Sequence, residues 1–319
     1  GMSSWIAAAT SYSTSNRIMV PFYVYYSMFG FQRIGDLAWA AGDMQARGFL
    51  LGGTSGRTTL NGEGLQHEDG HSHILAGTIP NCISYDPTFA HEVGVILHHG
   101  LKRMVEQQDN VYYYLTLLNE NYAMPGLTPG TEAQIIKGMY LCKSGGSAGL
   151  RVQLLGSGTI LRESLAAQEL LAQDWGVAAD VWSCPSFNEL ARDGQEAERW
   201  NMLHPSEAAK VPFVTQQLDA HTGPVVASTD YMKAYAEQIR PYVQGSAKGG
   251  RTYKVLGTDG FGRSDFRSKL REHFEINRHY IVLAALVALA EDGTLPTSKA
   301  VEAIAKYGIQ TDKINPLYA

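Results

Sequence analysis

The first part of the chain alternates short apolar runs with longer stretches of helical periodicity. Runs rich in β-branched and aromatic residues predict buried strands at residues 20–26, 49–51, 79–84 and 111–118. Between them, apolar residues recur every three or four positions across residues 27–47 and 89–106, which indicates amphipathic helices. Strands that alternate with helices of this length favour a parallel sheet covered on both faces.

The same alternation resumes after residue 150. Apolar runs predict strands near residues 152–155, 180–183, 211–215, 225–228 and 253–257. Helical spacing predicts helices at residues 161–173, 264–274, 276–291 and 297–307. The expected fold is therefore α/β, with two three-layer α/β/α domains whose sheets are mostly parallel.

The stretch between the two blocks is typical of a linker. Residues 119–147 contain Met124-Pro125-Gly126, Thr128-Pro129-Gly130 and Ser144-Gly145-Gly146-Ser147, in which Pro and Gly favour turns. We predict a first domain over residues 1–125, a linker over 126–149 and a second domain over 150–319.

The amino terminus has no signal for a helix start. Trp5, Ile6 and the alanines that follow are typical of the middle of an apolar helix, and no capping residue precedes them. Gly1 precedes Met2, as it does after removal of a tag. We therefore expect a piece of a longer protein, with the first domain incomplete at its amino end.

Composition and charge narrow the function classes. A formal net charge of −5 argues against a nucleic-acid or anionic-membrane surface, because such surfaces need clustered Lys and Arg. No apolar run approaches the roughly 18 residues of a membrane span. The 3 cysteines are widely separated and suggest neither disulfides nor a metal clip, as expected for a reducing cytoplasm. Small diffusing substrates are the default expectation.

The candidate functional element is the glycine-rich loop from Leu50 to Ile74. It contains almost nothing that could fill a core, and it holds several histidines and acids. Glycine is favoured where backbone passes close to another group, and loops at the carboxyl ends of buried strands bind ligands in α/β sheets. We interpret this segment as an active-site loop.

Three chemistries are considered for the loop. His67-Glu68-Asp69-Gly70-His71 matches the His-Glu-x-x-His pattern of zinc hydrolases, but that pattern needs a helix, which Asp69-Gly70 disfavours. The glycines at 52–56 and 156–158 lack the full phosphate-binding signatures of a P-loop or a dinucleotide fingerprint.

The third chemistry is general acid/base catalysis. Glu63 and His67 are four residues apart, so a helical turn or a compact loop would join a carboxylate to an imidazole. The alternative is a solvated loop whose histidines have no chemical role, and the loop's composition alone does not decide between the two.

Four segments of the sequence resemble the homodimeric bacterial pyruvate dehydrogenase E1 component. The segments are residues 25–36, the loop at 52–73, Glu189-Leu190-Ala191-Arg192-Asp193-Gly194, and Trp200-Asn201-Met202-Leu203-His204-Pro205. The similarity extends over essentially the whole chain. The loop pattern is specific to that family rather than to thiamine enzymes in general.

The resemblance implies part of a thiamine-diphosphate enzyme. Such an enzyme decarboxylates pyruvate and passes the acetyl group to the lipoyl domain of the dihydrolipoyl acetyltransferase. The chain would comprise the later part of the transketolase-like pyrimidine-binding domain and all of the C-terminal domain. The resemblance places Tyr26 and Phe29 in the aminopyrimidine pocket, with Glu63, His67 and Tyr26 as the catalytic groups. Without the resemblance, aromatic residues at such a corner are more often core.

The resemblance also implies what lies elsewhere. The diphosphate and magnesium site and the glutamate that activates the aminopyrimidine belong to earlier parts of the family's chain, so no metal ligand is assigned here. We expect the isolated chain to bind thiamine diphosphate poorly and to be inactive, and its partner to be a second E1 subunit. The open alternatives are a non-catalytic assembly or dimerisation module, a zinc hydrolase that uses His67, Glu68 and His71, and an enzyme for a longer 2-oxo acid.

Overall fold

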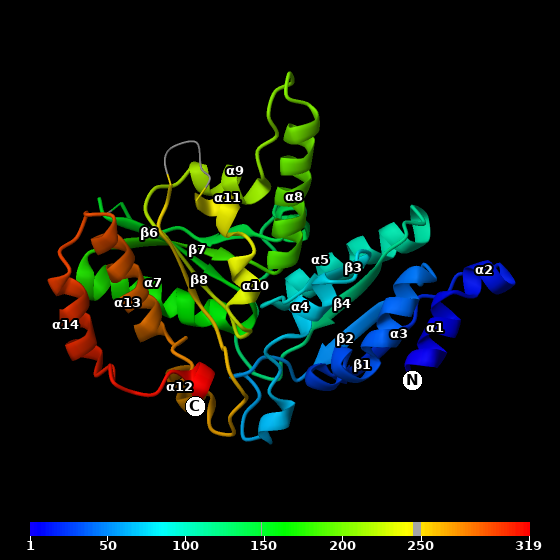
Figure 1. Ribbon diagram of the computed structural model, residues 1–319, viewed down its shortest axis with the longest axis horizontal. Coiled ribbons are helices and arrows are strands. Elements are labelled where there is room, and N and C mark those ends of the chain that lie inside the picture. The colour runs from blue at the N-terminus through cyan, green and yellow to red at the C-terminus, as the bar shows by residue number, and fades with distance from the viewer. Residues whose placement is uncertain (148, 245–249) are drawn as a thin grey trace.

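The computed structural model describes residues 1–147, 149–244 and 250–319. The chain forms two α/β lobes, with residues 1 to about 120 in one and the later residues in the other (Figure 1). Each lobe is built around its own sheet, so the α/β fold with two mostly parallel sheets is confirmed.

The first sheet has four parallel strands. They are β1 (Phe22–Tyr26), β2 (Phe49–Gly53), β3 (Cys82–Tyr85) and β4 (Tyr112–Thr116), in the order β1-β2-β4-β3. Tyr112 and Tyr114 face one core cluster and Tyr113 faces the other, as side chains of a strand buried on both faces must. The crossovers between strands account for the helices on both faces.

Helices cover both faces of this sheet. On one face, α1 (Met2–Ala9), α3 (Phe31–Asp43) and α4 (Ser72–Gly77) share a core with Leu50 and Tyr114. On the other face, α5 (Ala90–Leu101), extended by a π-helical turn, η3 (Lys102–Glu106), packs on Phe49 and Tyr113. The remaining short elements are α2 (Ser11–Ser15), η1 (Ser27–Phe29) and η2 (Leu65–His67).

The second sheet has five strands in the order β5-β7-β6-β8-β9. They are β5 (Tyr140–Lys143), β6 (Arg151–Gly156), β7 (Ala178–Ser183), β8 (Val225–Ser228) and β9 (Tyr253–Leu256). All pairs are parallel except β5 with β7, which is antiparallel at one edge.

Two helical layers flank the second sheet. One contains α7 (Leu161–Trp175), α13 (Arg278–Glu291) and α14 (Ser298–Tyr307). The other contains α8 (Phe187–Leu203), α9 (Phe213–Asp219), α10 (Ala234–Glu237) and α11 (Arg240–Gln244). The shorter elements η4 (Gly158–Ile160) and α12 (Arg267–His273) lie in connections, and η5 (Pro316–Tyr318) is the last element.

Two segments differ from the sequence-based expectation. The strand predicted at 211–215 is wrong: Pro212 precedes α9, whose Phe213, Val214 and Leu218 are buried at helical spacing. The segment expected to link the domains contains α6 (Glu132–Lys137) and β5, and β5 completes the second sheet. An apolar pair next to a proline does not distinguish a strand from a short helix.

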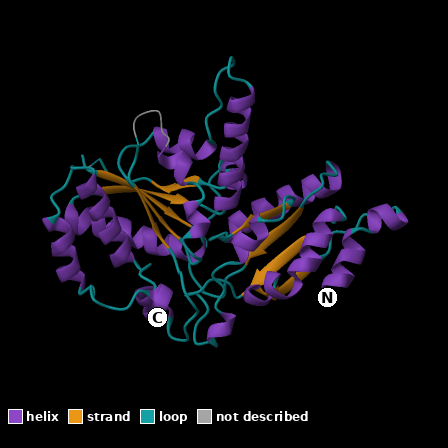
Figure 2. Cartoon of the chain, viewed as in Figure 1, coloured by secondary structure: helices purple, strands orange, loops and turns teal. Residues whose placement is uncertain are grey.

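The carboxyl ends of both sheets point toward the contact between the lobes (Figure 2). At that contact, Thr116 donates to Asp86 Oδ1 at 2.7 Å, and Ser157 donates to Asp86 Oδ2 at 2.9 Å. Burial raises the pKa of Asp86 to about 7. Buried polar side chains thus join the two domains beside the loops that follow the strands.

Candidate active site

Strands β1 and β2 end side by side and position the candidate loop. Tyr26, the last residue of β1, is in register with Gly53, the last residue of β2. After Tyr26 the chain turns through η1, which contains Phe29, and after Gly53 it enters the loop that leads to α4. This edge of a parallel sheet is where open α/β folds bind ligands.

Three of the residues predicted as site residues, Tyr26, Phe29 and Glu63, each contact the fourth, His67. The rings of Tyr26 and His67 are stacked, with centroids 5.6 Å apart and planes at 8°. The ring of Phe29 meets the same imidazole edge-on, with 4.8 Å between centroids. His67 Nδ1 lies 3.2 Å from Glu63 Oε2. We call these four residues the His67 cluster.

The His67 cluster is open to solvent. Tyr26 is 55% exposed, and the side chains of Glu63 and His67 are 48% and 26% exposed. The guanidinium of Arg33 covers the ring of Phe29 at 4.1 Å from its centroid. Because the core does not enclose these groups, they can meet a ligand without rearrangement of the domain. The contacts show that the four side chains lie close together, and their catalytic and cofactor-binding roles stay a prediction.

Arg57 anchors the loop to the second domain. Its Nη1 donates to the carbonyl oxygens of Thr258, at 2.5 Å, and Gly260, and its Nε donates to the carbonyl oxygen of Glu68. Burial lowers the pKa of Arg57, although the neighbouring Asp69 opposes that shift. Three backbone acceptors satisfy the guanidinium, so Arg57 holds the loop in place.

A second anchor joins the loop to Asp230 of the second domain. Thr58 donates to Asp230 Oδ1 through its backbone N at 2.9 Å and its Oγ1 at 2.7 Å, and Thr59 Oγ1 donates to Oδ2 at 2.5 Å. Burial raises the pKa of Asp230. The loop is therefore fixed at residues 57–59, and Glu63 and His67 of the His67 cluster lie on the part beyond that anchor.

Glu68 points away from solvent, unlike its neighbour His67. Its side chain is fully buried, and neither carboxyl oxygen has a hydrogen-bond partner among the described residues. Burial, followed by the charge of Asp230, raises the pKa of Glu68 to about 9. Glu68 is therefore protonated at neutral pH, which makes it unsuited to act as a base there.

The zinc-hydrolase alternative is not supported by the backbone of the loop. The turn η2 ends at His67, Glu68 has φ −79° and ψ 88°, and His71 has φ −145° and ψ −4°, so no helix connects the two histidines. Within residues 1–147, 149–244 and 250–319, no three His, Cys, Asp or Glu side chains are grouped as metal ligands. Asp69 instead accepts hydrogen bonds from His71 N and Ser72 N.

A cavity of about 470 Å³ lies beside the loop, between the two domains. It is lined from the first domain by Met28, Gln32, Arg57, Leu65, Gln66 and His71, and from the second by Met232, Gly260, Phe261 and Gly262. Burial lowers the pKa of His71, so its imidazole is less readily protonated than a free one. The volume of this cavity is within the range of small-molecule pockets.

His73 is part of the interior. It is fully buried, its Nε2 lies 3.0 Å from Thr116 Oγ1, and its ring stacks on Tyr235 at 5.0 Å between centroids. Burial lowers the pKa of His73 to about 3. His73 is thus a neutral histidine that packs at the contact between the domains.

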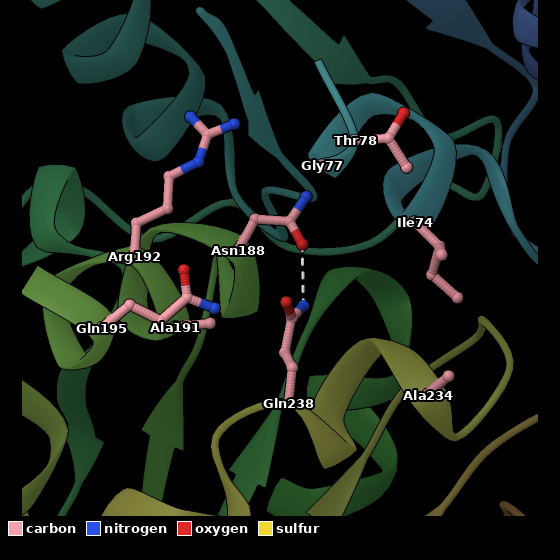
Figure 3. Close-up of a pocket in the computed structure, with 9 residues that line it drawn as sticks. All are labelled: Ile74, Gly77, Thr78, Asn188, Ala191, Arg192, Gln195, Ala234 and Gln238. Atoms are coloured by element: carbon pink, nitrogen blue, oxygen red, sulfur yellow. Dashed lines mark hydrogen bonds between the residues drawn. The ribbon is translucent and has the colours of Figure 1, made fainter. Parts of the chain in front are cut away.

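A separate cavity of about 260 Å³ lies where α4 meets α8 and α10. Figure 3 shows the side chains of Asn188 and Gln238 pointing toward each other across it, and Gln238 Nε2 donates to Asn188 Oδ1 at 2.7 Å. Arg192 also lines it and donates to the carbonyl oxygens of Ile79 and Cys82. The bonds from Arg192 join the two domains, whereas the bond between Gln238 and Asn188 lies within the second domain.

Sequence reasoning missed the contribution of the second domain to the site. Gly262 lies so close to the loop that an added Cβ would be 2.4 Å from the carbonyl oxygen of Leu65. The glycine-rich stretch 257–262 was the available signal, because glycine permits such close approach of backbones. Nothing in the spacing of the sequence indicated that this stretch meets the first domain.

Two models of known protein families match the chain, and both agree with this fold. Residues 1–125 match the pyruvate dehydrogenase E1 component middle domain, and residues 138–277 match the transketolase-like C-terminal domain. Among solved structures, a transketolase from Campylobacter jejuni superposes with a TM-score of 0.58 at 17% identity, over 85% of this chain and 36% of that one.

A second solved structure matches most of its own length. A chain described as a split gene transketolase, inactive beta4 tetramer, superposes with a TM-score of 0.61 at 15% identity, over 89% of this chain and 80% of that one. At such identities the likeness concerns the fold. The fold and the loop between its sheets therefore define a pair of transketolase-like domains.

Curated relatives identify the family more narrowly. The chain is 62% identical over 317 residues to the pyruvate dehydrogenase E1 component of Pseudomonas aeruginosa, and 62% identical over 318 residues to that of Escherichia coli K12. These alignments cover 99% of this chain and 35% of each relative. The chain belongs to the bacterial pyruvate dehydrogenase E1 family and spans about a third of the length of the relatives it matches.

No helix in the part of the chain that the structure describes is both long and apolar enough to cross a membrane.

Proposed function

We propose that this chain supplies the aminopyrimidine-facing and C-terminal parts of a thiamine-diphosphate-dependent pyruvate dehydrogenase E1. The enzyme decarboxylates pyruvate and transfers the acetyl group to the lipoyl domain of the acetyltransferase, in the cytoplasm and as a homodimer. The observation that carries the proposal is the His67 cluster, in which Tyr26, Phe29, Glu63 and His67 meet at the carboxyl ends of β1 and β2.

The composition of the cluster suits an aromatic cofactor. Tyr26 and Phe29 offer ring surface outside the core, and aromatic rings bind planar heterocycles by stacking and edge contacts. The chemistry that thiamine diphosphate supplies when bound is stabilisation of a carbanion. In this proposal the diphosphate and its magnesium are held by residues outside this chain.

The Glu63 and His67 pair handles protons in this proposal. The 3.2 Å contact between Glu63 Oε2 and His67 Nδ1 fixes the imidazole and leaves Nε2 to face the substrate. With one ring nitrogen held by Glu63, the other can accept a proton and return it in this proposal. Tyr26 stacks on that imidazole and keeps its plane fixed.

The experiment is a chimera in which residues 2–319 replace the matching third of the Escherichia coli relative, to which they are 62% identical. With thiamine diphosphate, magnesium and the lipoyl acetyltransferase, we expect pyruvate-dependent acetyl transfer that thiamine diphosphate saturates. The chain alone should give neither turnover nor a saturable low-micromolar binding isotherm for the cofactor. A folded dimeric chimera without pyruvate turnover would contradict the proposal.

A further inference from the structure

The second domain has a cationic cavity that shares no residue with the site described above. It has a volume of about 430 Å³ and lies between the start of α7, the helix α12 and the start of α13. Four of its lining residues are arginines, and we call it the arginine cavity, lined by Arg162, Arg267, Arg271 and Arg278. The acidic residues that line it are Glu120 and Glu163.

Positive charge exceeds negative charge in the arginine cavity. Glu120 accepts hydrogen bonds from Arg162 and Arg271, each at 2.6 Å, and Glu163 pairs with Arg278 at 2.9 Å. Burial opposes ionisation of Glu120, but the hydrogen bonds from Arg271 and Arg162 outweigh it and lower its pKa. Both carboxylates are paired, and the four guanidinium charges are only half balanced.

Guanidinium groups with free donors remain after this pairing. Arg271 is 6% exposed, and its Nε is buried without a hydrogen-bond partner among the described residues. Arg267 donates through Nε to the carbonyl oxygen of Thr59 at 2.6 Å, whereas its Nη1 and Nη2 make no hydrogen bond to the described residues. A buried N–H group without an acceptor is costly, so the cavity favours a ligand that provides acceptor oxygens.

Two helix ends add to the positive field. The first turn of α7, a helix of 15 residues, provides Arg162, and the first turn of α13, a helix of 14 residues, provides Arg278 and His279. Asn277 caps α13 by accepting from the backbone N–H of His279 at 3.0 Å. Helix N-termini carry partial positive charge and stabilise anions.

We propose that the arginine cavity binds a small phosphate-bearing anion. Arginine forks match the oxygens of phosphate, and several guanidinium groups together select more than one negative charge. The volume of about 430 Å³ accommodates a phosphate group together with an organic portion. The binding is independent of the proposed pyruvate chemistry, because none of the cavity's residues belongs to the His67 cluster.

The test is isothermal titration of the 319-residue chain at fixed ionic strength, with inorganic pyrophosphate and, in a second series, glucose 6-phosphate. We expect saturable binding at one site per chain, weakened at least tenfold by Arg267→Gln and by Arg162→Gln. Tighter binding of glucose 6-phosphate would assign the ligand to phosphorylated organic molecules, and tighter binding of pyrophosphate to free phosphates.

The matched control is Arg240→Gln. Arg240 is an arginine of the same domain that pairs with Glu237 at 2.6 Å and does not line the cavity. This variant should bind the probe like the unchanged chain. Absence of saturable heat with both probes, or equal weakening by Arg240→Gln and Arg267→Gln, would overturn the proposal. Circular dichroism confirms that each variant is folded before titration.

Discussion

Tyr26 and Phe29 contribute ring surface at the end of a strand, where packing alone would favour burial. Tyr26 is 55% exposed, and among the described residues its ring stacks only with His67. An exposed aromatic ring forgoes the stabilisation that burial provides, which fits a ring that meets a ligand. In the chimera, we expect Phe29→Ala and Tyr26→Ala each to weaken thiamine diphosphate binding about tenfold, the size of one lost aromatic contact.

Trp39→Ala is the control for that prediction. Trp39 is 47% exposed on α3, in the same domain, and lines a different cavity together with Gly42 and Asn81. Calorimetric titration of the three variants compares them directly. If Trp39→Ala weakened the cofactor as much as Phe29→Ala, the aromatic contacts would not be local to the cluster.

Glu68 should make stability depend on pH. Because burial raises its pKa to about 9, the folded chain holds a proton that the unfolded chain releases above pH ~4.5. Its contribution is complete below the unfolded pKa and falls as pH rises toward 9, by roughly 1.4 kcal/mol per pH unit for one proton. Glu68→Gln keeps the shape of the protonated acid and should raise stability at pH 8.

Urea unfolding at pH 6 and pH 8 measures that effect. The free energy of unfolding of Glu68→Gln should fall less between the two pH values than that of the unchanged chain. Glu63→Gln removes a carboxylate from the same loop, where the side chain is 48% exposed, and serves as the control. A parallel fall for Glu68→Gln and the unchanged chain would show that Glu68 is ionised when folded.

At the residue scale, the sequence identified contacts that depend on short separation. Glu63 and His67 are four residues apart and do meet, as that spacing predicted. The burial of Glu68 was not predictable, because in an irregular loop no period tells which of two neighbours faces inward. The hydrogen bonds that anchor Arg57 could not be predicted either, because their acceptors, Thr258 and Gly260, lie about two hundred residues further along the chain.

At the scale of elements, β1 is an edge strand that exposes apolar side chains on one face. Phe22 and Val24 are 51% and 60% exposed, and among the described strands β1 pairs with β2 alone. Exposed apolar edges promote association of chains. We predict concentration-dependent self-association of the isolated chain, which Val24→Lys should reduce because lysine at an edge opposes strand pairing.

Sedimentation velocity over a range of concentrations measures this association. The control is Val301→Lys on α14, since Val301 is 61% exposed and so matches Val24 in type and exposure. It should leave the association unchanged. Association that responds to Val301→Lys and not to Val24→Lys would place the contact elsewhere.

The close approach of Gly262 to the loop leads to a second prediction at this scale, which concerns the stability of glycine variants. A Cβ at Gly262 would be 2.4 Å from the carbonyl oxygen of Leu65, so Gly262→Ala should lower the melting temperature by displacing the loop. Gly35 lies inside α3 with no atom within 4 Å of its added Cβ, so Gly35→Ala should stabilise by about 0.5–1 kcal/mol. Thermal unfolding of both variants checks the opposite signs, and a shift of equal sign would contradict them.

Strongly periodic elements were predictable and short ones were not. The spacing in residues 161–173 and 276–291 predicted α7 and α13 to within two residues at each end, because long helices repeat their pattern several times. The short helix α9 was mistaken for a strand, since Val211, Phe213 and Val214 resemble either. Strand β5 was not predicted, because it lies between Pro- and Gly-rich stretches that favour a linker.

At the scale of the molecule, the central property is that two sheets direct their carboxyl ends toward one interface. The sequence predicted both sheets, but not their contact, because side chains such as Asp86 and Asp230 that join the domains look like ordinary loop acids. The chain spans 35% of the relatives' length, and in our proposal the groups that complete the site lie outside it.

The most direct test of the account is the steady-state rate of pyruvate decarboxylation by the chimera and two histidine variants. We predict that His67→Ala lowers kcat at least a hundredfold, the size of a lost proton-transfer group, while the fold and cofactor binding persist. His98→Ala, an exposed histidine on α5, should keep the full rate. Equal rates for His67→Ala and His98→Ala would contradict the account.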